Sequence, residues 1–354
     1  MKDDQATKSK YEPTELKVIE ADRQIRCARF TPDGQTLVAG DYDAQLRRWD
    51  LSGEEPRELP AVTGHHGWIE SLHFDEARKL LYVIDSWGQL CAWKYDQETP
   101  EPAWKHEAAH DGWIRSLAAS EDGRLLATAG RDQVVRVWQA EVGKLLHEFR
   151  GHTEDVYSVG IHPDGKSVVS GDLMGNLKQW DLASGKCLRE TKLESMHFAE
   201  RDQDVTGLRF LMFLDGGKTL VCAGSDPTQC GRMFGIPAIR LLEWDSWKER
   251  EVLHLGPNKN GYVFDLHWHP DGFFMLVTCG PPGAGKVAWF RPGEEKPFFE
   301  YDKLYNTHAL AWHQPSRRFV VAATNRSSQG NGAVLDKEGN YLGNTSPLHL
   351  FEMS

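Results

Sequence analysis

The sequence predicts an all-β fold: a seven-bladed β-propeller with four antiparallel strands in each blade. The first observation behind this prediction is a short motif that recurs seven times, as RRWD, CAWK, VRVW, KQWD, LEWD, VAWF and, at residues 333–336, AVLD. Its Trp, or the equivalent Leu, falls at positions 49, 93, 138, 180, 244, 289 and 335. Most of these steps are 42 to 46 residues long, which is the length of a propeller blade.

The second observation is a constant distance inside the repeat. In four units the apolar residue that opens the first strand stands 24 positions before the Trp, namely Ile25, Ile69, Ile114 and Val156. The first strand alternates apolar and polar residues, and a Pro-Asp-Gly turn follows it in three units. We therefore expect a strand, a tight turn and a second strand at the same place in each unit.

The other two strands of a unit follow from the same pattern. The Trp-ending motif comes after a short apolar stretch such as TLVAG, and a more polar stretch such as KLLHEFR comes after the motif. A lone four-stranded sheet of this kind cannot cover both of its faces, so the blades stack in a ring and bury apolar surface between them. Each repeated Trp is expected in the core, where its truncation would cost about 3–5 kcal/mol.

The whole chain is predicted to form one domain. It has 354 residues, of which 40% are apolar and 26% charged, and the repeat accounts for most of this length. We expect one propeller over residues 15–345, with a flexible polar tail at 1–14 and a C-terminal tail at 346–354. The fifth unit is longer than the others, which predicts an insertion near residues 225–237 on the binding face.

Two segments could supply the outer strand that closes the ring. Residues 15–21 (ELKVIEA) precede the first inner strand and can complete the last blade. Residues 341–343 (YLG) follow the last motif at the spacing of an outer strand from the same unit. We favour closure by the N-terminal strand.

Composition narrows the class of protein. The first residues lack the apolar core of a signal peptide, and no run of 18 apolar residues occurs, so we expect a soluble, cytoplasmic protein that is a monomer in isolation. The six cysteines form no CxxC pair and are expected to be reduced. A formal net charge of −11 argues against binding to nucleic acid or to anionic membranes.

At this point the chain resembles the WD-repeat β-propeller family, with Gly-His near the start of a unit and Trp-Asp near its end. In three units a His stands 28 residues before the Trp, and the resemblance extends over residues 15–345. It implies a structural hydrogen-bonded chain of a His, a Ser or Thr, an Asp and the Trp inside a blade. The third unit matches this chain fully with His110, Thr128, Asp132 and Trp138.

Other units depart from the family pattern at the expected Asp. The fourth unit has Met174 there, and the second has Trp87. The first unit keeps Asp43 but has Ala39 in place of the hydroxyl residue. We expect these blades to depend on apolar packing instead.

Three other patterns suggest chemistry, and for each we favour a structural interpretation. The His, Thr and Asp of a unit are the residues of a hydrolytic triad, but the resemblance places them inside a blade. Residues 280–286 (GPPGAGK) have the spacing of a phosphate-binding loop but stand between two strands rather than before a helix. His267, His269 and His313 could gather a metal ion, but no carboxylate or thiol is placed with them. We predict no cofactor, no metal and no catalytic residue.

Binding is expected at the central opening on one face of the ring. The loops between second and third strands emerge on that face, as do the connections between blades, and it is therefore the loop-rich face. Residues beside the opening apolar residue of each unit ring the opening, as the resemblance implies. The candidate partner-binding residues are Trp68, Trp113, Arg26, Arg115, Tyr157, Tyr262, Phe264, Asp155 and Glu70.

Trp68 and Trp113 are the foremost of these candidates, because Trp, Tyr and Arg are enriched at binding hot spots. The opposing interpretation is that both indoles only cap neighbouring inner strands. Our hypothesis is a non-catalytic scaffold that docks a protein or peptide on the loop-rich face. The alternative is a propeller enzyme with its active site at the central opening of the same face.

Overall fold

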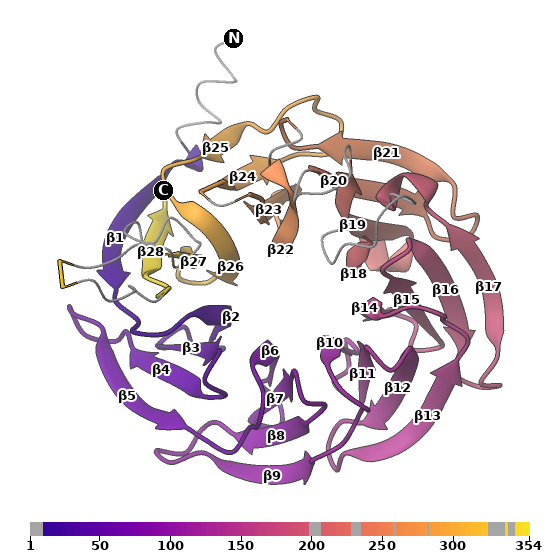
Figure 1. Cartoon of the computed structure of the whole chain (residues 1–354), viewed down its shortest axis with the longest axis horizontal. Coiled ribbons are helices and arrows are strands. Elements are labelled where there is room, and N and C mark those ends of the chain that lie inside the picture. Colours follow the sequence, from indigo (N-terminus) through magenta and orange to yellow (C-terminus); the bar gives the residue numbers. More distant parts are fainter. Residues whose placement is uncertain are drawn as a thin grey trace.

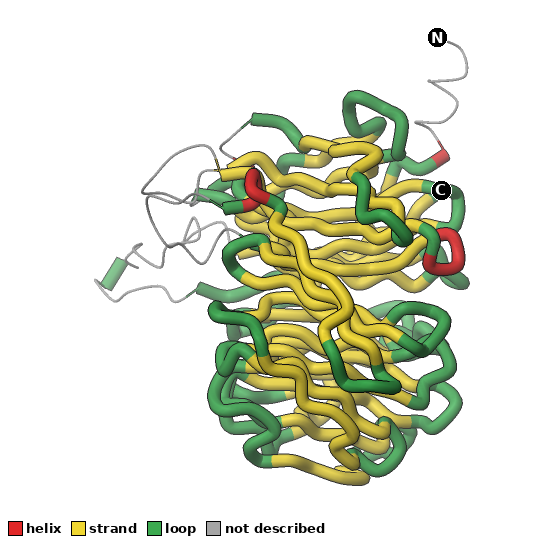
Figure 2. Tube along the Cα trace, turned by 90° about the vertical axis from the view of Figure 1, so that its right-hand side faces the viewer, coloured by secondary structure: helices red, strands yellow, loops and turns green. Residues whose placement is uncertain are grey.

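The computed structural model describes residues 10–197, 207–227, 235–257, 260–281, 283–324, 337–338 and 344–354. Over these residues the strands form seven antiparallel four-stranded sheets, arranged as blades around a central axis (Figure 1). The predicted seven-bladed, all-β propeller is therefore confirmed. The view from the side shows the loops and turns gathered mainly on two opposite faces of the ring (Figure 2).

The blades share one order of strands from the axis outward. The innermost strands are β2 (Ile25–Phe30), β6 (Ile69–Asp75), β10 (Ile114–Ala119), β14 (Val156–Ile161), β18 (Leu208–Leu214), β22 (Tyr262–His269) and β26 (Tyr305–His313). The second strands are β3 (Thr36–Asp41), β7 (Leu80–Asp85), β11 (Leu125–Gly130), β15 (Ser167–Asp172), β19 (Thr219–Pro227), β23 (Phe273–Cys279) and β27 (Arg318–Thr324).

The third strands of the first four blades and of the sixth contain the repeated motif, that of the fifth overlaps the start of its motif, and the fourth strands lie at the circumference. The third strands are β4 (Leu46–Asp50), β8 (Leu90–Lys94), β12 (Val134–Gln139), β16 (Asn176–Asp181), β20 (Gly235–Glu243), β24 (Gly285–Phe290) and β28 (Leu348–Met353). The outer strands are β5 (Arg57–Val62), β9 (Glu101–His106), β13 (Lys144–Arg150), β17 (Cys187–Lys192), β21 (Glu249–His254), β25 (Phe299–Tyr301) and β1 (Pro13–Ile19). Two short 3-10 helices, Glu194–Met196 and Asp215–Gly217, complete the regular elements of the described residues.

The apolar core is divided among the contacts between neighbouring blades. The described residues contain seven buried clusters, and each joins two adjacent blades. Second strands are the most buried, because each lies inside its sheet and between two neighbouring blades; every residue of β7 and of β15 is buried. The outer strand β17 is mostly exposed, which matches its polar sequence.

The N-terminal strand closes the ring. β1 pairs with β28 from Pro13 opposite Met353 to Ile19 opposite Leu348, so both ends of the described chain complete the seventh blade. This confirms the closure that we favoured. The alternative closing segment, residues 341–343, lies outside the described residues, as does the AVLD motif at 333–336.

The expectation of a C-terminal tail at 346–354 is wrong. β28 is the third strand of the seventh blade and pairs with both β27 and β1. Phe351 lies opposite Phe319, at the register position where Trp138 lies opposite Leu126 in the third blade. This strand was expected at AVLD, which stands at the spacing of the repeat, whereas β28 comes later in its unit than the third strands of the other blades.

Residues 10–14 also belong to the fold, in contrast to the flexible tail expected for residues 1–14. Tyr11 is 5% exposed, and its ring packs edge-on against Phe273 at 4.9 Å. Its hydroxyl donates a hydrogen bond to Asp271 (2.6 Å), and its carbonyl accepts one from Nε1 of Trp289 (3.1 Å). The segment before β1 therefore seals the contact between the sixth and seventh blades.

The fifth-blade insertion begins and ends as paired strand rather than as loop. β19 and β20 continue their pairing through Ser225 opposite Pro237 and Pro227 opposite Gly235. Residues 228–234 lie outside the described residues. Within the described part of the chain, no helix has the length and apolar character needed to span a membrane.

Candidate partner-binding site at the central opening

A backbone contact places two kinds of loop at the same end of the strands. In four blades, the residue before the inner strand accepts a hydrogen bond from the first residue of the turn that leaves the second strand. The donors are the backbone N–H groups of Tyr42, Ser86, Arg131 and Leu173, and their acceptors are the carbonyls of Gln24, Trp68, Trp113 and Asp155, respectively, at 2.9–3.0 Å. The predicted rim residues thus lie beside the turns between second and third strands, at one mouth of the ring.

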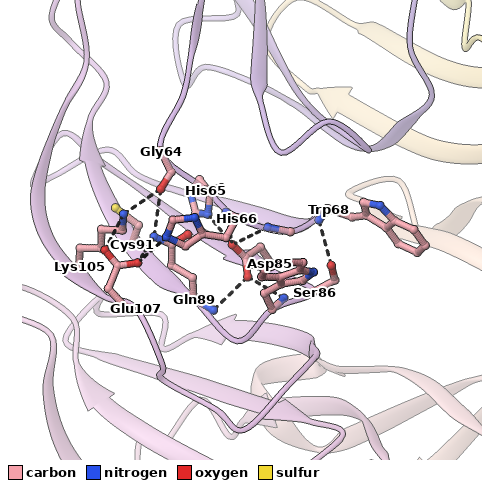
Figure 3. Close-up of polar contacts among 12 residues, drawn as sticks. Gly64, His65, His66, Trp68, Asp85, Ser86, Gln89, Cys91, Lys105 and Glu107 are labelled. Carbon is pink, nitrogen blue, oxygen red and sulfur yellow. Dashed lines mark hydrogen bonds and ion pairs between the residues drawn. The ribbon is translucent and has the colours of Figure 1, made fainter.

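In the second blade one buried carboxylate organises this mouth (Figure 3). Asp85 is 0% exposed, and its Oδ2 accepts from the backbone N–H groups of His66 (3.2 Å) and Gly67 (3.4 Å). Its Oδ1 accepts from the backbone N–H groups of Trp87 (2.9 Å) and Gln89 (3.0 Å). Burial opposes ionisation of Asp85, but the hydrogen bonds from His65 and the backbone lower its pKa below the usual value.

The two segments that Asp85 holds each present a tryptophan to solvent. Trp68 is 41% exposed, and its backbone N–H donates to Oγ of Ser86 (2.9 Å). In Figure 3 its indole points away from the polar contacts around Asp85. Trp87 is 70% exposed and lies against Gly67, where an added Cβ would stand 2.6 Å from its ring. The mouth of the second blade therefore carries two exposed indoles on a hydrogen-bonded frame.

Around the opening, side chains from successive blades form a closed series of contacts, which we call the aromatic–arginine belt. It starts at Glu70, which accepts two hydrogen bonds from the guanidinium of Arg26 (2.6 and 3.0 Å). Glu70 also accepts a hydrogen bond from Nε1 of Trp113 (3.2 Å). Burial of Arg26 opposes its charge, but the Glu70 carboxylate prevails and raises the pKa of the guanidinium well above its usual value.

From Trp113 the belt alternates between guanidinium groups and rings. Arg115 lies 3.7 Å from the centre of the Trp113 ring and 4.7 Å from that of Tyr157. Arg209 lies 4.9 Å from the centre of Tyr157 and 4.2 Å from that of Tyr262. These distances are those of cation–π contacts, which strengthen where the cation is removed from water.

The belt closes through the sixth blade. Tyr262 stacks on Phe264 with ring centres 5.7 Å apart, and Arg26 lies 4.7 Å from the centre of Phe264. His308 of the seventh blade touches the same ring edge-on at 6.1 Å. Beside the belt lies a cavity of about 260 Å³. The arginines that line it are Arg26, Arg29, Arg115 and Arg209.

All nine predicted residues lie in or against the belt. Trp68 contacts Trp113 edge-on at 5.4 Å, and Asp155 pairs with Arg115 at 3.5 Å. The nine residues do not form a simple ring of exposed side chains, because Tyr157 and Tyr262 are only 5% and 8% exposed. Of the nine, Trp68 is the exposed aromatic, whereas the two tyrosines form the wall of the opening.

Sequence reasoning missed three residues of this mouth. Trp87 was considered only as a replacement for an Asp, although Trp in a turn between strands could have indicated an exposed ring. Tyr42 packs on Trp68 at 4.7 Å, and its position directly after the second strand could have suggested this. Arg209 stands one residue after the opening Leu208, the same position as Arg26 and Arg115. The irregular length of the fifth unit hid that correspondence.

The structural hydrogen-bonded chain of the third blade is present. Nε1 of Trp138 donates to Oγ1 of Thr128 (2.9 Å), and Nε2 of His110 lies 2.8 Å from the same oxygen. Nδ1 of His110 lies 2.9 Å from Oδ1 of Asp132. Burial opposes ionisation of Asp132, but the hydrogen bonds from His110 and Arg136 hold its pKa well below the usual value. The oxygen of Thr128 is thus occupied within the blade.

The expectation that the second and fourth blades lack the Asp of this chain is wrong. In the fourth blade Nδ1 of His152 lies 2.9 Å from Oδ2 of Asp172, two residues before Met174. In the second blade His65 lies 3.2 Å from Asp85, two residues before Trp87. The acid comes from the end of the second strand instead of from the turn.

The first blade uses the same strand-end position. Its carboxylate is Asp41, which stands two residues before Asp43 and is 0% exposed. Oδ1 of Asp41 accepts from the backbone N–H groups of Asp43 (2.9 Å) and Gln45 (2.8 Å), and Oδ2 accepts from Arg47 (3.1 Å). This blade therefore has a polar anchor of its own, which the sequence analysis did not expect.

The other patterns with possible chemistry have separate structural surroundings. His267 bonds the carbonyl of Leu310 (2.8 Å), His313 bonds that of Pro32 (3.0 Å), and His269 stacks on Phe273 at 4.2 Å. Among the described residues, no three His, Cys, Asp or Glu side chains are grouped as a metal site. The loop-like sequence GPPGAGK leads into the strand β24 rather than a helix.

Comparison with known proteins agrees with this repeat architecture. The family described as "WD domain, G-beta repeat" matches residues 14–50, 105–139 and 143–181. Each matched stretch includes outer-strand residues of one blade and the three inner strands of the next. The match therefore follows the closure of the ring, in which β1 is the outer strand that precedes the first blade.

Two relatives illustrate the similarity. A guanine nucleotide-binding protein subunit beta of Zea mays is 24% identical over 286 residues, which are 77% of this chain and 70% of that protein. Apoptotic protease-activating factor 1 of Rattus norvegicus is 26% identical over 167 residues, 47% of this chain. The matched part is only 13% of the length of that second protein.

The closed ring of seven four-stranded blades, with a His–Asp contact inside three of them, defines a repeat propeller. Three of its blades match the repeat unit of the WD-repeat β-propeller family.

Proposed function

We propose that the protein is a non-catalytic interaction scaffold that docks a protein or peptide on the loop-rich mouth of the ring. The observation that carries this proposal is the pair of exposed indoles, Trp68 at 41% and Trp87 at 70% exposure. Both belong to segments that the buried carboxylate of Asp85 holds in place. A rigid aromatic surface loses little conformational entropy on binding and is typical of interface hot spots.

The surroundings of the indoles support the same proposal. Trp113 and Tyr42 both pack against Trp68, and the belt continues this aromatic surface around the opening. One relative is by name a subunit of a larger assembly. The net charge of −11 favours a protein partner over nucleic acid or an anionic membrane. We further propose that the scaffold is a monomer and acts in the cytoplasm.

The test is affinity purification from the native cell with the wild-type chain and a Trp68→Ala/Trp87→Ala variant. The matched control is Val142→Ala/Leu188→Ala, which removes two side chains of similar exposure, 55% and 56%, from the circumference of the ring. Because none of these side chains is buried, each variant should melt within a few degrees of wild type.

Partners that wild type and the control retain, and that the tryptophan variant loses, support docking at this mouth. The loss should be at least tenfold, since truncation of a hot-spot Trp costs roughly 2 kcal/mol or more per residue. Identical partner sets for all three chains would reject the mouth as the docking surface. Retention of no partner by the wild type would reject the scaffold.

A further inference from the structure

We propose that the cavity beside the aromatic–arginine belt binds one carboxylate, carried by an acidic side chain of the docked peptide, between Arg115 and Arg209. The inference rests on the proposed docking function for the source of the carboxylate. It goes beyond that function because it assigns a chemical requirement to the partner. Both arginines line the cavity of about 260 Å³, which has room for a side chain but not for a folded segment.

Stacking sets the orientation of both guanidinium groups. Arg115 lies between Trp113 and Tyr157, and Arg209 lies between Tyr157 and Tyr262. A planar guanidinium whose faces meet aromatic rings keeps its N–H donors in the plane, at the edge. Such an edge matches the two oxygens of a carboxylate and is already ordered before the ligand arrives.

Both groups also have an unused donor. Nε of Arg115 and Nε of Arg209 are buried atoms that have no hydrogen-bond partner among the residues that the structure describes. The Arg115 side chain is only 8% exposed, so bulk water does not readily compensate for this loss. A buried donor without a partner costs about 1–3 kcal/mol, more for a charged group, and a bound oxyanion would recover this. The two arginines therefore offer hydrogen-bond donors that a bound ligand could satisfy.

The charge balance points to a ligand with a single negative charge. Among the described residues, three arginines around the cavity have carboxylate partners, and the pairs are Arg26 with Glu70, Arg29 with Asp265 and Arg115 with Asp155. Arg209 is the fourth arginine, and the described residues offer it no carboxylate within 4 Å. Within the described part of the opening one positive charge therefore has no carboxylate partner, and a bound carboxylate would neutralise it. A phosphate group carries up to two negative charges near neutral pH and would leave excess negative charge among largely buried side chains.

The test measures binding of three small probes to the full chain by ligand-detected NMR. The probes are glutamate, glutamine and phosphoserine, each capped at both ends as an N-acetyl methylamide. The test variants are Arg115→Gln and Arg209→Gln, with Arg209→Lys to keep the charge without the planar fork. Arg124→Gln is the matched control, since its side chain is 77% exposed and pairs only with Asp122 in the described residues.

We expect capped glutamate to bind wild type and the Arg124→Gln control equally, and capped glutamine to bind neither. Each Gln variant should weaken glutamate binding by roughly tenfold or more, because one charge-assisted pair is lost. Arg209→Lys should bind capped glutamate more weakly than wild type and more tightly than Arg209→Gln. Thermal melting shows which variants are folded, and the comparison uses the variants that melt like wild type.

Equal glutamate binding by wild type and Arg209→Gln would overturn the proposal, as would the absence of binding to wild type. Tighter binding of phosphoserine than of glutamate would overturn the assignment to a carboxylate. A Trp87→Ala variant separates this proposal from the scaffold proposal, because Trp87 is 70% exposed, does not belong to the belt and does not line the cavity. It should bind capped glutamate like wild type even if it loses, or never had, a protein partner.

Discussion

At the scale of single residues, the carboxylate that contacts the buried histidine of a blade comes from either of two sequence positions. Asp132 stands six residues before its Trp, whereas Asp85 and Asp172 stand eight residues before theirs. Both arrangements bring a carboxylate within 2.9–3.2 Å of Nδ1 of the blade's histidine. The shift is possible because the strand end and the following turn both pass the buried His. A pattern of residue types at fixed spacing recognises only one of the two positions.

The hydroxyl in this chain can be tested at Thr128. Thr128→Val keeps the shape of a 0% exposed side chain but leaves Nε1 of Trp138 without its acceptor. We expect a loss of about 1–3 kcal/mol in the free energy of unfolding, measured by urea denaturation. The matched control is Val83→Ala, which lies at the same register in the second blade, where Trp93 donates directly to His65.

The control should lose stability through a cavity, without a polar component. If Thr128→Val were as stable as wild type, the hydrogen bonds of the chain would contribute nothing measurable to the third blade.

At the scale of elements, the seventh blade shows how a strand can be missed when its marker residue differs. β28 has Phe351 where the first four blades have Trp, and Phe351 stacks on Phe319 with ring centres 4.9 Å apart. The closing strand β1 was predictable, because an outer strand must precede the first inner strand when the ring closes. The third strand was not predictable from spacing, because the connection after β27 is longer than the corresponding connection in any other blade.

Truncation of Phe351 distinguishes a strand from a tail. Phe351 is 2% exposed, so Phe351→Ala should lower the free energy of unfolding by about 3–5 kcal/mol, measured by chemical denaturation. Leu188→Ala, on the exposed outer strand β17, is the control and should change stability by less than about 1 kcal/mol. A Phe351→Ala variant with wild-type stability would contradict the assignment of β28 to the core.

At the scale of the whole molecule, the belt joins all seven inner strands around one opening. Its contacts connect residues far apart in the chain, such as Arg26 with Phe264 and Arg209 with Tyr262. The ring also encloses neutral histidines. Burial is the main cause that lowers the pKa of His73, His110, His267 and His269, and it lowers the pKa of His308 to about 4.

These histidines predict a loss of stability in mild acid. Between the folded-state pKa and the unfolded value near 6.5, the unfolded chain binds protons that the folded chain does not, so stability falls as pH is lowered through this window. The depressed pKa values of Asp85, Asp132 and Asp265 act lower, because their contribution is present above about pH 4 and is lost below it.

The measurement is urea denaturation at about pH 7 and about pH 5 for wild type and His308→Gln. Wild type should be less stable at the lower pH, and the variant should lose about 1 kcal/mol less than wild type over the same interval, a figure reduced for the partial exposure of the ring. The same loss in both chains would show that His308 does not contribute to the acid sensitivity.

The sequence by itself determined the number of blades, the order of strands within most of them and the end of the ring at which the rim residues lie. Those features depend on local periodicity and on a repeat that each unit carries. Only the tertiary structure decided that Trp68 and Trp87 are exposed while Tyr157 and Tyr262 are walls, and that Arg209 joins Arg115 beside one cavity. Exposure and side-chain pairing at the opening depend on how seven blades converge, and no single repeat contains that information.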